Sequence, residues 1–246
     1  MEILSALFKP VLDFALPPRC PICGILVDAD NRFCLSCWEG LDFLTAPWCA
    51  TCGRPFAYDH GSDAQCAPCM KKPPDHNGVR AVVAYDDKSS LLAMRLKYGG
   101  RLGFAELIAG HMARFLDEVG PDSVIIPVPL HRWRLWSRGF NQSVLIGRAL
   151  SKRSGIAIET GLLSRKNATP PLRSMSAKQR NKIVKNAFVL SSEVDDRLVG
   201  KTVILVDDVY TTGSTANACA RKLRAAGADR VLVFCWARVL TEYDRS

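Results

Sequence analysis

The segment that most constrains this chain covers residues 203–215 and reads VILVDDVYTTGST. Its first four residues are aliphatic, as in a short buried strand, and two adjacent carboxylates follow directly. A hydroxyl-rich turn and a helical segment at 216–226 come next. This order predicts a phosphate site at the carboxyl end of a parallel strand. An aspartate that only caps the helix would explain one carboxylate, but not two followed by such a turn.

The turn supplies the groups that a phosphate needs. Backbone N–H groups at a helix N-terminus favour an anion, Gly213 allows close approach of the backbone, and the hydroxyls add donors. The motif resembles the site for phosphoribosyl pyrophosphate (PRPP) in type I phosphoribosyltransferases. That resemblance implies that Asp207 and Asp208 accept hydrogen bonds from the ribose 2- and 3-hydroxyls. The residues expected to bind PRPP are Asp207, Asp208, Val209, Tyr210, Thr211, Thr212, Gly213, Ser214 and Thr215.

Eight of the ten cysteines lie between residues 20 and 69, in four Cys-x-x-Cys pairs. Each pair can turn two thiolates toward one ion, and two pairs close a tetrahedral zinc site, so two structural zinc ions are expected. Sequential pairing groups the ligands as Cys20, Cys23, Cys34 and Cys37, then Cys49, Cys52, Cys66 and Cys69, and an interleaved pairing stays open. Cys219 and Cys235 are expected to be small buried hydrophobic residues.

Two modules are predicted, divided by a Pro-rich segment at 71–75. Residues 1–72 are expected to form the zinc module with a short N-terminal helix, and residues 78–246 an α/β domain. Strands are expected at 79–85, 124–128, 188–190, from 203, and at 231–238, with helices at 89–96, 103–116 and 141–153. This alternation predicts a doubly wound, Rossmann-like parallel sheet. Segment 166–178 is expected to be a mobile loop that closes over the site.

No apolar run approaches the roughly 20 residues that span a bilayer, and the N-terminus lacks the basic region of a signal peptide. A cytoplasmic location is therefore expected.

Positive charge is concentrated between residues 129 and 185, where thirteen lysines and arginines face one acid, Glu159, within a formal net charge of +9. Three interpretations compete. The block is a solvated face, a set of cations for a pyrophosphate leaving group, or a surface for single-stranded nucleic acid, because arginines alternate with tryptophans at 132–138. The candidate pyrophosphate or nucleic-acid contacts are Arg132, Arg134, Arg138, Asn141 and Gln142.

Several motifs occur together in this chain: the cysteine module, Leu-Lys-Tyr-Gly-Gly at 96–100, Pro-Val-Pro-Leu at 127–130, Arg-Gly-Phe-Asn-Gln at 138–142, and the segment 203–215. Together they resemble the ComF family of competence-associated, phosphoribosyltransferase-like proteins, over nearly the whole chain. The resemblance implies a double zinc ribbon, a type I phosphoribosyltransferase fold, a Mg²⁺-PRPP site, and a role in DNA uptake alongside partner proteins. In related transferases the pyrophosphate loop falls on Pro127, Val128, Pro129 and Leu130.

Two functions follow from this resemblance. One is a transferase that releases pyrophosphate from PRPP, in DNA uptake or nucleotide-linked metabolism. The other is a non-catalytic PRPP sensor that binds single-stranded nucleic acid. Purine-salvage relatives often carry an aspartate where this chain has Thr211. A purine acceptor handled through that acid is therefore not favoured.

Overall fold

The computed structural model describes residues 17–99, 102–166, 187–191 and 197–241. The expected N-terminal helix and nearly all of the expected mobile loop at 166–178 lie outside the described residues.

A four-stranded sheet forms the centre of the α/β domain. Its strands are β1 (Gly78–Ala84), β2 (Ser123–Pro127), β5 (Thr202–Tyr210) and β6 (Arg230–Arg238), in the order β1-β6-β5-β2. Each neighbouring pair is parallel. Two short strands, β3 (Leu163–Arg165) and β4 (Phe188–Leu190), form a separate antiparallel pair.

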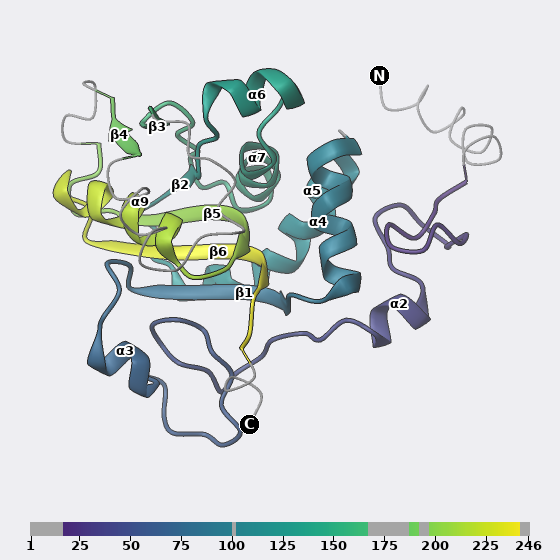
Figure 1. Ribbon diagram of the computed structural model, residues 1–246, viewed down its shortest axis with the longest axis horizontal. Coiled ribbons are helices and arrows are strands. Elements are labelled where there is room, and N and C mark those ends of the chain that lie inside the picture. The colour runs from purple at the N-terminus through teal and green to yellow at the C-terminus, as the bar shows by residue number, and fades with distance from the viewer. Residues whose placement is uncertain (1–16, 100–101, 167–186, 192–196, 242–246) are drawn as a thin grey trace.

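Helices cover both faces of the sheet (Figure 1). One face carries α4 (Asp87–Gly99), α5 (Leu102–Met112) and α7 (Gln142–Ser154), and the other carries α9 (Ser214–Ala225). Strand residues alternate between the two cores: Ile204 and Val206 belong to the first, Val203 and Leu205 to the second. The predicted doubly wound parallel sheet is therefore confirmed.

Some elements differ from expectation. The helix expected at 103–116 is α-helical only to Met112 and continues as a 3-10 helix, η1 (Ala113–Glu118). The strand that begins near Val203 continues through both aspartates to Tyr210, because its ladder with β6 continues to the pair Tyr210–Arg238. Helix α6 (Arg132–Arg138) and strand β3 were not expected.

The cysteine module contains two short helices, α2 (Leu35–Glu39) and α3 (Ala67–Lys71). It packs directly on the α/β domain, since Cys20, Ile22 and Cys37 share a buried core with α4 and α5. A side chain at Gly53 would place its Cβ 2.3 Å from the carbonyl oxygen of Val79 in β1, so this close approach requires glycine.

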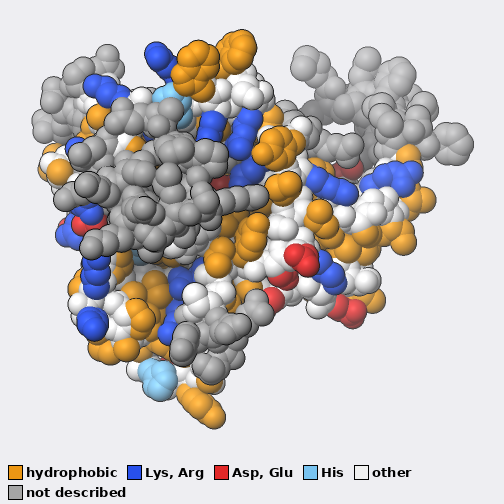
Figure 2. Space-filling view, in the orientation of Figure 1, with side chains coloured by type: hydrophobic (Ala, Val, Ile, Leu, Met, Phe, Trp, Pro, Cys, Tyr) orange, Lys and Arg blue, Asp and Glu red, His pale blue; other side chains and the backbone are white. Residues whose placement is uncertain are grey.

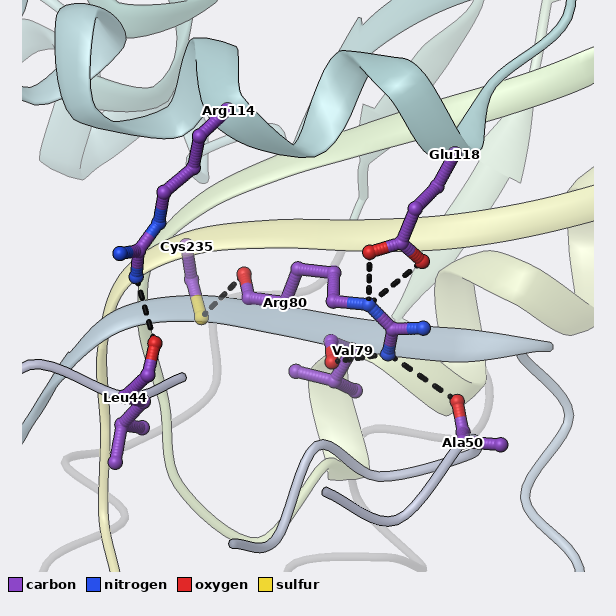
Figure 3. A network of polar contacts seen from close by, with 7 residues as sticks. All are labelled: Leu44, Ala50, Val79, Arg80, Arg114, Glu118 and Cys235. Carbon is purple, nitrogen blue, oxygen red and sulfur yellow. Dashed lines mark hydrogen bonds and ion pairs between the residues drawn. The ribbon is translucent and has the colours of Figure 1, made fainter. Parts of the chain in front are cut away.

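Two arginines of the α/β domain hold the module in place (Figure 3). Arg80 Nε donates to both carboxylate oxygens of Glu118, at 2.6 and 2.7 Å, and Arg80 Nη1 donates to the carbonyl oxygen of Ala50 at 3.2 Å. Arg114 Nη2 donates to the carbonyl oxygen of Leu44 at 2.7 Å. The division at 72–78 stays a prediction, because these contacts join the two expected modules closely.

Candidate functional site

A cleft of about 920 Å³ opens at the carboxyl ends of β2 and β5. The strand register explains its position: Pro127, the last residue of β2, pairs with Val206, so Asp207 and Asp208 continue past the end of β2. The cleft therefore lies where parallel α/β sheets bind their ligands. Its lining includes Met94, Lys97, Tyr98, Val128, Pro129, Leu130, Trp133, Arg134, Ser137, Arg138, Gln142, Ser143, Arg165, Asp207, Asp208, Thr211 and Thr215.

The two aspartates are held differently. Asp207 Oδ1 accepts hydrogen bonds from the backbone N–H of Asp208 at 2.9 Å and from Ser143 Oγ at 3.3 Å. Asp208 is buried and its Oδ2 lies 2.5 Å from Lys97 Nζ. Loss of hydration, together with the adjacent charge of Asp208, raises the pKa of Asp207 to about 8.

The loop between β5 and α9 has the geometry of an anion cradle. Gly213 adopts φ 73° and is the N-cap of α9, so the helix begins on a residue without a capping side chain. A Cβ at this glycine would lie 2.3 Å from the Tyr210 hydroxyl. Thr212 Oγ1 and Ser214 Oγ lie 2.9 Å apart, and a cavity of about 70 Å³ is lined by Asp207, Val233 and 209–216. The loop therefore offers hydroxyls and N-terminal N–H groups around a small space.

Some of the residues expected to bind pyrophosphate line the cleft, and others lie behind its lining. Val128, Pro129 and Leu130 line the cleft, whereas Pro127 ends β2. Asn141 caps α7 by accepting from the N–H of Ser143 at 3.0 Å, and its Nδ2 donates to the carbonyl oxygen of Val128 at 3.0 Å. Asn141 thus holds the loop at 128–130 to the start of α7.

The three arginines of α6 also lie in different places. Arg134, Arg138 and Gln142 line the cleft, and Arg138 lies 5.4 Å from the centroid of the Tyr98 ring. Arg132 instead lies 5.9 Å from the centroid of the Trp133 ring, outside the cleft lining. Trp133 and Trp136 are 61% and 82% exposed. Figure 2 shows hydrophobic side chains beside basic ones at this edge of the molecule.

Seven residues of the cleft lining were not among the expected site residues: Met94, Lys97, Tyr98, Trp133, Ser137, Ser143 and Arg165. Lys97 and Tyr98 lie in the 96–100 motif, which contributed to the resemblance to the ComF family but was not assigned a binding role. Ser143 directly follows the 138–142 motif, whereas Arg165 belongs to the unexpected strand β3.

Beside the loop at 211–215, a chain of contacts leads from Tyr210 to the cysteine module. The Tyr210 hydroxyl lies 3.1 Å from His76 Nε2, and Arg238 stacks 5.5 Å from the Tyr210 ring centroid. Arg238 also donates to the carbonyl oxygen of Cys52. Burial lowers the pKa of His76 to about 4, so this imidazole is neutral near pH 7. A groove of about 870 Å³ between the module and α9 meets the first cleft at Thr211.

The cysteines form two four-sulfur clusters with sequential pairing, one from residues 20–37 and one from 49–69. In each cluster all sulfur atoms lie within 4.8 Å of one another. Cys23 Sγ and Cys34 Sγ are 3.5 Å apart, and Cys52 Sγ and Cys66 Sγ are 3.6 Å apart. Tetrahedral zinc with sulfur at about 2.3 Å requires about 3.8 Å between sulfurs, so both clusters fit zinc. Cys219 and Cys235 are fully buried and belong to neither cluster, as predicted.

Comparison with known proteins agrees with this architecture. Residues 11–72 match the family model of the double zinc ribbon domain. Together with the parallel sheet, this match defines an α/β protein with an N-terminal double zinc ribbon. Within the described part of the chain, no helix is long and apolar enough to cross a membrane.

The chain belongs to the ComF family. It is 31% identical to competence protein F of Haemophilus influenzae over 227 residues, which cover 89% of this chain and 96% of the relative. It is 35% identical to the DNA utilization protein YhgH of Escherichia coli O157:H7 over 199 residues, covering 78% of this chain and 84% of the relative. It is 28% identical to competence protein ComFC of Bacillus subtilis over 211 residues, covering 82% of each.

Solved structures include phosphoribosyltransferases that are distantly similar. An adenine phosphoribosyltransferase is 16% identical, with a TM-score of 0.38, covering 60% of this chain and 75% of that one. The purine phosphoribosyltransferase of Pyrococcus horikoshii is 18% identical, with a TM-score of 0.33, covering 53% of this chain and 70% of that one. Nothing about activity follows from likenesses at these scores.

Proposed function

We propose that the cleft at the carboxyl ends of β2 and β5 binds Mg²⁺-PRPP. The observation that carries this proposal is the adjacency of two complementary sites. The loop at 211–215 offers N–H and hydroxyl donors to a 5-phosphate, and Asp207 and Asp208 offer carboxylate oxygens to the ribose hydroxyls.

Pyrophosphate is placed against the opposite wall. Val128, Pro129 and Leu130 line the cleft together with Arg134 and Arg138. Mg²⁺ would be held by the phosphates with a carboxylate of the acidic pair, and it would neutralise charge on the leaving group.

We further propose that the protein is a phosphoribosyltransferase. Departure of pyrophosphate leaves an oxocarbenium-like ribosyl centre, which the acceptor captures. Cations of the cleft wall stabilise the charge that develops on pyrophosphate, and Asp207 and Asp208 hold the ribose in position. Two relatives are named for competence and for DNA utilization, which supports a role in DNA utilization. We propose DNA uptake, alongside partner proteins, as the specific form of that role. The same proposal includes a cytoplasmic location, because thiolate ligands persist in a reducing compartment.

Calorimetric titration with Mg²⁺-PRPP tests the binding site. Wild-type protein is expected to bind saturably, and Asp207→Ala/Asp208→Ala is expected to bind at least about tenfold more weakly, because the hydrogen-bonding partners of both ribose hydroxyls are lost. Equal affinity in both proteins would refute the assignment. Pyrophosphate release, measured with and without free bases or single-stranded DNA, then separates a transferase from a sensor.

A second candidate function is a PRPP-responsive factor that binds single-stranded nucleic acid. The exposed rings of Trp133 and Trp136, with Arg132 beside the first, favour it, since bases stack on such rings and phosphates bind such cations. Replacing Arg132, Arg134 and Arg138 with alanine should weaken binding of a single-stranded oligonucleotide and flatten its salt dependence. An unchanged salt slope would assign these arginines to pyrophosphate or to the solvated surface.

A further inference from the structure

A lysine that carries no assigned role forms an ion pair with one of the two acidic residues of the cleft. Lys97 lies near the C-terminal end of α4, and its Nζ lies 2.5 Å from Asp208 Oδ2. The side chain of Asp208 is 8% exposed and that of Lys97 is 25% exposed. The ammonium group therefore lies in the cleft, at one of the two carboxylates proposed to hold the ribose.

This contact conflicts with the proposed ligand. A ribose hydroxyl that donates to Asp208 shares this buried carboxylate with the ammonium, and a hydroxyl that binds Oδ2 displaces Lys97 from it. An ammonium displaced into a partly dehydrated cleft needs a new anionic partner, because an unpaired charge there is costly. Lysine suits such a move, since its charge lies on a flexible four-carbon stem.

The composition of the cleft indicates where that partner would come from. Among the described residues of its lining, the only carboxylates are Asp207 and Asp208, whereas the other charged groups are Lys97, Arg134, Arg138 and Arg165. With the 5-phosphate on the 211–215 loop and the ribose on the two aspartates, the anion of the ligand that is left for Lys97 is the pyrophosphate.

We propose that the ammonium group of Lys97 forms an ion pair with Asp208 in the ligand-free protein, and that it moves to a pyrophosphate oxygen when PRPP binds. The inference rests on the proposed function and adds a positioning residue to it. Lys97 thereby links the ribose half of the site to the pyrophosphate half. It keeps the buried carboxylate neutralised before binding, and it contributes affinity only for ligands that carry pyrophosphate.

Substitution Lys97→Met tests this with two partial ligands, ribose 5-phosphate and magnesium pyrophosphate. The variant removes a competitor of ribose, so its affinity for ribose 5-phosphate should be unchanged or up to about threefold higher, while affinity for pyrophosphate should fall about tenfold or more. Lys97→Arg, which keeps the charge, should retain pyrophosphate binding. Lys88→Met removes an exposed lysine from the same helix and should change neither affinity.

A merely structural ion pair predicts a different result. In that case Lys97→Met would weaken both partial ligands alike, or would leave pyrophosphate affinity unchanged, and either outcome overturns the proposal. If Lys97→Met does not fold, Lys97→Met/Asp208→Asn removes both partners and is compared with Asp208→Asn alone. The double variant should bind pyrophosphate about tenfold more weakly than the single one. Equal affinities would overturn the proposal, whereas a wild-type protein that does not bind PRPP would overturn the proposed function as well.

Discussion

At the scale of single residues, the acidic pair shows how burial and function oppose each other. The carboxyl group of Asp207 lies at the end of a buried strand beside a second carboxyl group, and its pKa is raised from 3.8 to about 8. A carboxylate placed only for stability would be paired with a cation and have a lowered pKa. The raised pKa of Asp207 instead reflects its burial beside a second carboxyl group, at the position that we propose binds the ribose.

This raised pKa makes stability depend on pH. Between pH 4 and pH 8 the folded protein holds a proton on Asp207 that the unfolded chain has lost, so the free energy of unfolding falls as pH rises through this range. Asp207→Asn has no titrating group at this position, so its free energy of unfolding should not fall in this way as pH rises. We expect its Tm to match that of wild type at pH 4 and to exceed it by about 10 °C or more at pH 8.5, as measured by calorimetry. Asp229→Asn, on an exposed loop, is the control; a difference that does not depend on pH would contradict the account.

At the scale of elements, the loop at 211–213 joins β5 to α9 through one glycine. Gly213 needs a positive φ, and its Cα faces the Tyr210 hydroxyl. Gly213→Ala should therefore lower the free energy of unfolding by about 1–2 kcal/mol from the backbone conformation, with a further loss from overlap with Tyr210. The same change at Gly155, which has φ 73° and open space around it, measures the backbone contribution alone.

Chemical denaturation of the two alanine variants makes the comparison. Gly213→Ala should be the less stable, and Gly213→Ala/Tyr210→Phe should recover part of the difference because the hydroxyl is gone. Equal losses at Gly213 and Gly155 would mean that Tyr210 does not restrict the loop.

The elements also show what the sequence could predict. The strands of the sheet are buried apolar runs, and the four Cys-x-x-Cys pairs specify their own ligands, so both were predictable. Helix α6 was not, because it buries no residue and so has no apolar period. Strand β3 has three residues, too few for a pattern. Lys97 was missed because its pairing with Asp208 joins residues that are distant in sequence.

At the scale of the whole molecule, the zinc module is fixed to the α/β domain by buried polar contacts. Arg80 is central to them, because it binds Glu118, the carbonyl oxygen of Ala50 and the Trp48 ring, 4.9 Å from its centroid. Arg80→Ala should lower the free energy of unfolding by about 2–4 kcal/mol. Arg32→Ala removes an exposed ion pair with Asp28 and should cost less than about 1 kcal/mol. Equal losses in urea denaturation would refute the role of Arg80.

Zinc content is a second property of the whole molecule. Two zinc ions per chain are expected by atomic emission, since each cluster supplies four sulfur ligands. Cys49→Ser should leave about one ion, whereas Cys235→Ala should leave two, because that buried thiol belongs to neither cluster. Loss of zinc in Cys235→Ala would mean that the ligand sets are wrong.

The central claim is that one cleft at the carboxyl edge of the sheet holds both halves of PRPP. A crystal structure of the zinc-loaded protein with Mg²⁺-PRPP tests it most directly. The account predicts the 5-phosphate on 211–215, the ribose hydroxyls on Asp207 and Asp208, and pyrophosphate against 128–130 with Lys97 moved away from Asp208. PRPP bound in the groove beside the zinc module, with the acidic pair still joined to Lys97, would contradict the claim.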